Sequence, residues 1–154
     1  MANTYSQLII HLVIAVRNRE SLLIEKHRSE IFKYISGILF QRGHKPIIVN
    51  GVADHVHILF GLNPTEAISD LTREIKKSVS SFINNKKYLH GKFYWQEGYG
   101  AFSYSKSQLD TLYNYILKQE EQHKRSSFRT EYLEILDEFG IEYNPEYLFD
   151  FTIR

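Results

Sequence analysis

The order in which strand-like and helix-like segments follow one another is the sequence feature that most constrains the fold. In residues 5–16, side chains two positions apart would share one face of a strand. One such face is aliphatic, with Leu8, Ile10, Leu12, Ile14 and Val16. In the helical segments, apolar residues instead recur every three or four positions. The predicted elements are a strand at about 5–16, a helix at about 20–42, strands at about 45–51 and 53–62, a helix at about 65–84, and a strand or hairpin in the aromatic segment FYWQEGYGAFSYS.

This β-α-β-β-α-β order predicts an α+β fold with a ferredoxin-like (RRM-like) antiparallel sheet and helices on one of its faces. Two further helices are predicted as C-terminal additions, one beginning near Ser107 and one over about 130–139, ending at Gly140. The 154 residues contain no internal repeat and no Pro/Gly-rich linker, so we expect a single domain over residues 1–154.

Short polar residues mark two expected helix starts. Thr65 or Asn63 is the expected N-cap of the helix at about 65–84, because such side chains accept hydrogen bonds from first-turn N–H groups. Ser107, followed by Asp110, resembles a capping box with Asp in place of Glu.

Composition excludes several classes of protein. There is no cysteine, which rules out disulfides and thiolate metal sites. No apolar run approaches the roughly 20 residues that span a bilayer, and the N-terminus lacks the basic leader of a signal peptide, so we expect a cytoplasmic protein with no membrane partner.

The net charge is only +1, but residues 126–154 carry −5, so residues 1–125 carry +6. This uneven distribution is compatible with an anion-binding face, although a solvated surface would explain it equally well.

Two histidines, His55 and His57, lie one residue apart in the predicted strand ADHVHILFGL. On a strand both rings would project from the same face, where two imidazoles can bind one metal ion. The spacing alone is weak evidence, because seven histidines in this chain give about 0.3 such pairs by chance. Structural histidines are therefore the alternative reading.

A metal site of this kind needs a third protein ligand, and Gln119 in YILKQ is the candidate. Tyr115 precedes Gln119 by four residues, so on a single helix both side chains would project from one face. The amide oxygen would reach the metal, and the Tyr115 hydroxyl would lie beside it. This spacing too is weak evidence alone, because it arises about 0.4 times by chance. Tyr115 is also consistent with an amphipathic core tyrosine, because it sits beside Tyr113, Ile116 and Leu117.

Four segments in order carry a resemblance: YSQLIIHLVIAVRNRE, ADHVHILF, WQEGYGAFSYSKS, and YILKQEEQH followed by EYLEILDEFGIEYNPEYLF. With them, the chain resembles single-tyrosine transposases of the HUH class, the insertion-sequence 200/605 (IS200-like) family. The resemblance implies that His55, His57 and Gln119 bind a divalent metal, Mg²⁺ or Mn²⁺, and that Tyr115 is the nucleophile. It also implies cleavage and rejoining of single-stranded DNA through a 5′-phosphotyrosine, in a bacterial or archaeal cell.

Further implications of the resemblance concern partners. It implies a homodimer in which the histidines of one subunit work with the tyrosine helix of the other. It also implies that the DNA ends of a mobile element are recognised as hairpins.

Basic and aromatic residues are candidates for DNA contacts. Arg73, Lys76 and Lys77 lie at helical spacing, where they would meet phosphates, and Trp95 would stack on unpaired bases. Further candidates of the same two kinds are Lys86, Lys87, Lys92, Tyr94 and Tyr99. Solvated lysines and core aromatics are the alternative interpretation.

Two other functions remain open from the sequence. The same chemistry would serve a nickase of the replication-initiator or relaxase kind, or a domesticated enzyme that processes chromosomal repeats. A different class would be a non-catalytic, ferredoxin-like nucleic-acid-binding module. The chain's small size, without a helicase-sized extension, favours the transposase over the initiator.

Overall fold

A four-stranded antiparallel sheet forms the centre of the computed structural model, which describes residues 5–17 and 22–144. Its strand order is β2-β3-β1-β4, which places β3 and β1 in the middle. The strands are β1 (Ile9–Ala15), β2 (Lys45–Gly51), β3 (His55–Gly61) and β4 (Gly100–Tyr104). This order and the connecting helices are those of the predicted ferredoxin-like α+β fold, which is confirmed.

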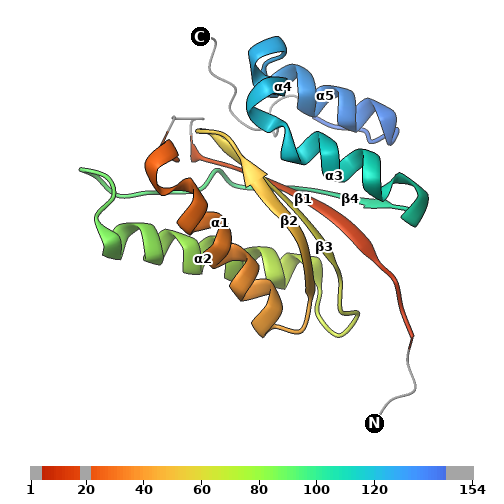
Figure 1. Cartoon of the computed structure of the whole chain (residues 1–154), viewed down its shortest axis with the longest axis horizontal. Coiled ribbons are helices and arrows are strands. Elements are labelled where there is room, and N and C mark those ends of the chain that lie inside the picture. Colours follow the sequence, from red (N-terminus) through yellow and green to blue (C-terminus); the bar gives the residue numbers. More distant parts are fainter. Residues whose placement is uncertain (1–4, 18–21, 145–154) are drawn as a thin grey trace.

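Helices α1 (Glu25–Gln41) and α2 (Ile68–Lys86) cover one face of the sheet (Figure 1). Each buries an apolar stripe at helical spacing, such as Leu71, Ile75 and Val79 in α2. These stripes pack on Ile10, Leu12, Ile14, Val16, Val56, Ile58 and Phe60 of the sheet. From Ile10 to Val16 the predicted aliphatic face of the first strand is therefore the floor of the main core, whereas Leu8 precedes β1 and is 41% exposed.

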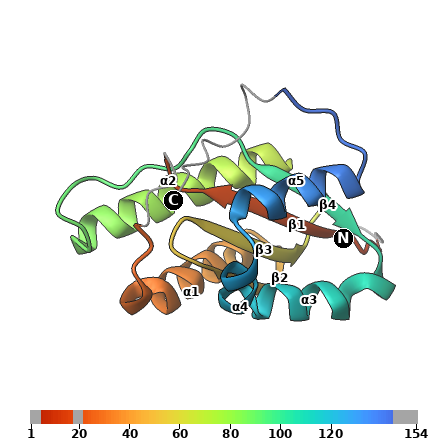
Figure 2. The ribbon, with the colours of Figure 1, turned by 90° about the horizontal axis from the view of Figure 1, so that it is seen from above.

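Three shorter helices cover the opposite face: α3 (Leu109–Leu117), α4 (Gln119–Arg125) and α5 (Phe128–Glu138). Leu112 and Ile116 of α3 pack against Leu59. On the other side, α5 packs against Val13, Ala15 and Phe102 through Phe128, Tyr132, Ile135 and Leu136. Seen from above, α3 and α5 flank the middle of the sheet, and α4 joins them (Figure 2). This face of the sheet therefore has two small apolar clusters with a polar strip between them.

Several predicted element ends are wrong by a few residues. The first helix begins at Glu25 rather than about 20, although residues 20 and 21 lie outside the described part of the chain. The second begins at Ile68 after Ala67, because the Asn63 side chain instead accepts a hydrogen bond from the Thr65 N–H at 3.0 Å and forms a turn. The last helix begins at Phe128, because the Ser127 hydroxyl accepts from the Thr130 N–H.

The predicted third helix differs more. Its capping box joins Ser105 to Gln108 across a single 3₁₀ turn, Lys106–Gln108, rather than Ser107 to Asp110. The helix also ends at Leu117, and the chain resumes as α4 at Gln119. Tyr115 and Gln119 therefore do not share one continuous helix.

No helix within residues 5–17 and 22–144 is both long enough and apolar enough to cross a membrane.

Gly100 allows α5 to approach the sheet. A Cβ at this position would lie 2.5 Å from the Tyr132 hydroxyl oxygen and 2.9 Å from Tyr132 Cε1. Because Tyr132 is buried, we expect Gly100→Ala to lower the free energy of unfolding by about 1–3 kcal/mol, measured by chemical denaturation. Gly91→Ala is the matched control, because a Cβ there meets nothing within 4 Å. Equal stability of the two variants would contradict this packing.

Candidate active site

The pairing of β1 with β3 places three histidines on the sheet face beneath α3–α5. His57 lies opposite Val13 and His55 lies opposite Ala15, so His11, two residues from Val13, shares their face. All three side chains are fully buried. His11 Nε2 lies 2.7 Å from His57 Nδ1, and His55 Nδ1 lies 2.7 Å from Asp54 Oδ1. Nε2 of His55 and Nε2 of His57 therefore face the helices.

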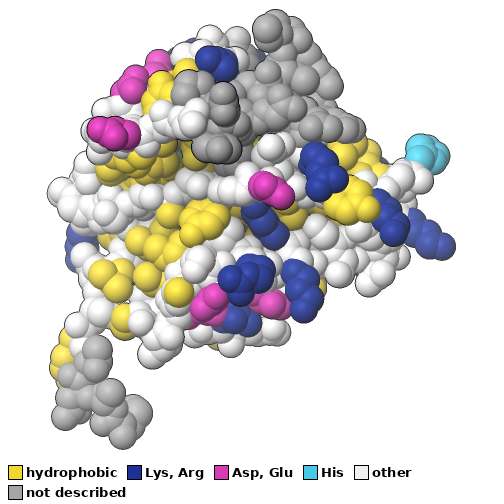
Figure 3. Space-filling view, turned by 180° about the vertical axis from the view of Figure 1, so that it is seen from behind, with side chains coloured by type: hydrophobic (Ala, Val, Ile, Leu, Met, Phe, Trp, Pro, Cys, Tyr) yellow, Lys and Arg dark blue, Asp and Glu magenta, His cyan; other side chains and the backbone are white. Residues whose placement is uncertain are grey.

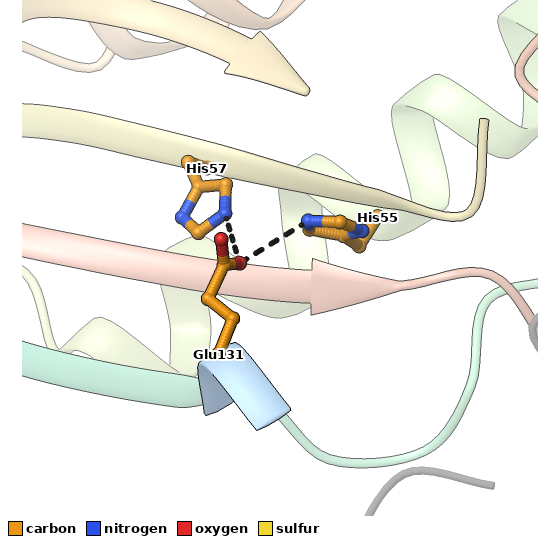
Figure 4. Close-up of side chains that lie close together, drawn as sticks. All are labelled: His55, His57 and Glu131. Atoms are coloured by element: carbon orange, nitrogen blue, oxygen red, sulfur yellow. Dashed lines mark hydrogen bonds and ion pairs between the residues drawn. The ribbon is translucent and has the colours of Figure 1, made fainter. Parts of the chain in front are cut away.

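Glu131 reaches this pair from α5, on a side chain only 2% exposed. Its Oε1 atom lies 3.0 Å from His57 Nε2 and 3.4 Å from His55 Nε2 (Figure 4). Its Oε2 atom lies 3.3 Å from His123 Nε2, on α4. One carboxylate therefore contacts three imidazoles.

The junction between α3 and α4 positions the two residues predicted from YILKQ. On β2, the Asn50 amide donates to the carbonyl oxygens of Ile116 and Leu117 at 2.9 and 3.2 Å. Last-turn carbonyls of a helix lack the usual N–H partner four residues on, so this contact helps to fix the end of α3 on the sheet. Lys118 then bends the chain, and Gln119 enters the site from the first turn of α4.

The bend brings Tyr115 and Gln119 to the histidines without a shared helix. Gln119 is fully buried, and its Oε1 lies 3.2 Å from His55 Nε2. Its Nε2 donates to Glu131 Oε2 at 3.4 Å. The half-buried Tyr115 ring stands edge-on to His57, with ring centroids 6.0 Å apart. All four residues predicted for the site thus lie together within one chain.

The donor atoms at the centre of this cluster fit a divalent cation. His55 and His57 each offer Nε2, and Glu131 offers Oε1, with all three atoms within 4.8 Å of one another. Ligands about 2.1 Å from an ion lie about 3.0–3.4 Å apart in octahedral or tetrahedral geometry. Three separations here fall in that range: His57 Nε2 to Glu131 Oε1 (3.0 Å), His55 Nε2 to Gln119 Oε1 (3.2 Å) and His55 Nε2 to Glu131 Oε1 (3.4 Å). Mixed nitrogen and oxygen donors suit Mn²⁺ and related transition ions as well as Mg²⁺.

Buried charge sets the protonation of the cluster. Burial alone would raise the pKa of Glu131, but hydrogen bonds from His123, His55 and His57 outweigh it and hold that pKa well below its usual range. Burial lowers the pKa of His57 despite Glu131. For His55 the carboxylates of Asp54 and Glu131 outweigh burial, and the pKa is raised. Burial and then His57 lower the pKa of His11, so its ring is neutral.

Tyr115 is a difficult residue to ionise in this environment. Burial, followed by the Glu131 carboxylate, raises the pKa of its hydroxyl far above the ordinary value. Two hollows adjoin the ring, one of about 370 Å³ that His11, Glu134 and Glu138 also line, and one of about 250 Å³ that Lys118 and Arg125 also line. A nucleophilic Tyr115 therefore needs a nearby positive charge during reaction.

The structure places the candidate DNA contacts on the other side of the sheet. Arg73 and Lys77 are exposed on α2, and Arg73 pairs with Asp70. Basic side chains gather over this region of the surface, with acidic ones among them (Figure 3).

Lys76 and Trp95 have structural contacts instead. Lys76 Nζ donates to the carbonyl oxygens of Gln96 and Gly98, and partial burial lowers the pKa of Lys76 to about 8. Trp95 is 8% exposed, and its indole N–H donates to the Lys76 carbonyl. Trp95 is therefore a core residue in this structure. Arg73 and Lys77 remain the candidates for contacts with DNA.

Sequence reasoning missed Glu131 and His11. Glu131 is one of the acidic residues of the segment 126–154, but Phe128, Glu131, Tyr132 and Ile135 lie at i, i+3, i+4 and i+7, so a carboxylate occupies the buried stripe of α5. His11 is the polar member of the second face of β1, beside Ile9, Val13 and Ala15. A charged or polar residue at an apolar-stripe position was the available signal in both cases.

Comparison with known proteins identifies the family. Residues 4–119 match the family described as transposase IS200 like, so the chain belongs to that family. The ISDra2 transposase TnpA of Deinococcus radiodurans is 26% identical over 118 residues, which cover 73% of this chain and 84% of that protein. Membership of this family supports a transposase function, that of a DNA-processing enzyme.

Two solved structures share the fold. A transposase from Deinococcus radiodurans R1 has a TM-score of 0.58 at 22% identity, covering 77% of this chain and 95% of that one. A REP-associated tyrosine transposase bound to a REP hairpin has a TM-score of 0.60 at 18% identity, covering 80% of this chain and 73% of that one.

Metal binding at this site should weaken as the pH falls. A histidine must be neutral to ligate, and the raised pKa of His55 means that it protonates first as the pH is lowered. We expect Mn²⁺ affinity, measured by calorimetry, to be constant at alkaline pH. At lower pH, protonation of one histidine competes with metal binding, and the affinity should fall by about tenfold per pH unit. His57→Ala should abolish binding, whereas His90→Ala, an exposed histidine, should not. A pH-independent affinity would contradict ligation by His55.

Proposed function

We propose that residues 1–154 form a single catalytic domain that cleaves and rejoins single-stranded DNA at the ends of a mobile element, with Tyr115 as nucleophile. The observation that carries the proposal is the convergence, in one chain, of Tyr115 with four donor atoms from His55, His57, Gln119 and Glu131. Family membership supports the same chemistry.

The reaction is a transesterification. The Tyr115 hydroxyl loses its proton, its oxygen attacks a backbone phosphorus, and the bond from phosphorus to the 3′ oxygen breaks. The departing oxygen takes up a proton as a 3′-hydroxyl, so the step neither gains nor loses a proton. Because the 5′-phosphotyrosine keeps the energy of the ester bond, another 3′-hydroxyl can reverse the step and join a different strand. A divalent ion, when bound, neutralises charge on the phosphate oxygens and favours the ionised tyrosine. We propose Mg²⁺ or Mn²⁺ for this role.

His55, His57 and Gln119 are proposed as metal ligands, and Glu131 is added to them as a fourth. The cluster then carries one carboxylate charge from Glu131 against two from the cation. The remaining coordination positions and the remaining positive charge suit a phosphate oxygen. Asp54 holds Nδ1 of His55, which directs Nε2 of that ring at the ion.

Single-stranded hairpin DNA is the proposed partner. The REP-associated tyrosine transposase with this fold is bound to a REP hairpin, which supports the same class of partner here. A homodimer is also proposed, although one chain already brings Tyr115 to its own His57. Exchange of tyrosine helices between subunits and a cytoplasmic location remain predictions from the sequence.

Tyr115→Phe should abolish covalent attachment to DNA. We expect wild-type protein with Mn²⁺ and a labelled hairpin oligonucleotide from the element end to give a protein–DNA adduct that migrates more slowly in a denaturing gel. Loss of the hydroxyl removes the attacking atom, so the variant should form no adduct while still binding the oligonucleotide. Tyr113→Phe, two residues away on the exposed side of α3, is the matched control and should retain the adduct.

The outcomes separate the competing functions. An adduct in Tyr115→Phe would overturn the nucleophile assignment. Binding without any adduct in the wild type would favour a non-catalytic binding module. Cleavage without rejoining when a second 3′-hydroxyl strand is supplied would favour a nickase.

Arg73 and Lys77 should contribute to DNA affinity through phosphates. We expect Arg73→Ala/Lys77→Ala to weaken binding of single-stranded DNA and to lower the slope of log affinity against log salt by about 1–1.5, since each lost phosphate contact removes about 0.7. Fluorescence anisotropy at several salt concentrations measures both. Lys33→Ala, an exposed lysine on α1, is the control. An unchanged slope would remove α2 from the DNA interface.

A further inference from the structure

His11 is a buried imidazole that the proposed chemistry does not use. It is fully buried on β1, and its Nε2 lies 2.7 Å from Nδ1 of His57. The two rings stack with centroids 4.9 Å apart and an angle of 22° between their planes. A contact this short between two ring nitrogens is a hydrogen bond in which one ring donates and the other accepts.

The direction of this bond depends on what His57 Nε2 contacts. A neutral imidazole has one N–H and one lone pair. When Nε2 of His57 donates to Glu131 Oε1 at 3.0 Å, Nδ1 of His57 is a lone pair and His11 must donate. When Nε2 of His57 holds a metal ion, its hydrogen is on Nδ1, and His11 must accept.

The surroundings of His11 allow both directions. Its Nδ1 is buried and has no hydrogen-bond partner among the described residues. The ring can therefore carry its hydrogen on either nitrogen without breaking a second bond to the protein. A carboxylate or carbonyl partner, by contrast, only accepts, and would fix His57 in one tautomer.

We propose that His11 is a positioning residue of the metal site, whose hydrogen bond to His57 reverses when His57 exchanges Glu131 for a metal ion. This inference rests on the proposed function, in which His57 is a ligand. The His11–His57 bond keeps the His57 ring in place in both states. The metal ion can then enter a site whose geometry is already set, at the cost only of moving two hydrogens.

Metal affinity with two replacements of His11 tests this role. His11→Phe keeps a buried ring but cannot accept or donate, and we expect Mn²⁺ affinity by calorimetry to fall by about 10–100-fold. His11→Gln places an amide near the Nε2 position, which can both donate and accept, and should bind within about threefold of wild type. His44→Phe is the matched control, because His44 is also buried but bonds to Glu66 and Asn63 instead.

Nitrogen-15 NMR of the wild-type protein reads the bond itself and does not depend on the variants folding. In the metal-free protein, the ring hydrogen of His57 should be on Nε2. With Zn²⁺ bound it should be on Nδ1, and coupling across the bond to His11 Nε2 should persist in both states. A hydrogen that stays on the same His57 nitrogen in both states would overturn the proposal.

The calorimetry gives two distinct failures. If wild type binds Mn²⁺ and His11→Phe binds equally well, or His11→Gln is as weak as His11→Phe, the role of His11 is refuted and the metal site stands. If wild type binds neither Mn²⁺ nor Zn²⁺, the proposed metal site and this inference fail together.

Discussion

The register of β1 against β3 is the constraint on which the rest of the structure depends. It pairs Val13 with His57, so that one face of the central strands is aliphatic and the other carries the histidines. If β3 shifted by one residue against β1, its side chains would exchange faces. The histidines would then lie on the face that α1 and α2 cover, and Val56 and Ile58 would lie on the face that carries the polar strip. Since the aliphatic face from Ile10 to Val16 is buried, the same burial that drives folding also directs His55 and His57 toward α3–α5.

The polar strip between α3 and α5 then has to accommodate a buried negative charge. A lone carboxylate in an apolar interior would become neutral, because desolvation penalises its charged form. Glu131 stays ionised through its imidazole contacts, and these rings are held in turn by Asp54, His11 and the sheet. When the imidazoles are neutral, the carboxylate charge of Glu131 is uncompensated within this cluster, and a divalent cation would be attracted to it.

Local patterns predicted most of the fold. Period-two alternation and the spacing of Leu71, Ile75 and Val79 were sufficient for strands and helices, because each element buries one face. The bend at Lys118 was not predictable, because it depends on Asn50, more than sixty residues earlier, capturing the end of α3. The position of Glu131 on the apolar stripe of α5 was a signal that this residue is unusual, but its role depends on His57, which lies 74 residues earlier in the sequence.

Charge around Tyr115 would constrain how the proposed DNA substrate approaches. The larger hollow beside the ring is bordered by Glu134 and Glu138, and carboxylates there repel a phosphate. The smaller hollow has Lys118 and Arg125 on its rim, although Glu121 also lines it. In the proposed reaction, electrostatics would therefore favour entry of a phosphate along the α3–α4 junction. That junction is also the point where Asn50 holds the end of α3, so the residue that holds the bend also borders the approach to Tyr115, the proposed nucleophile.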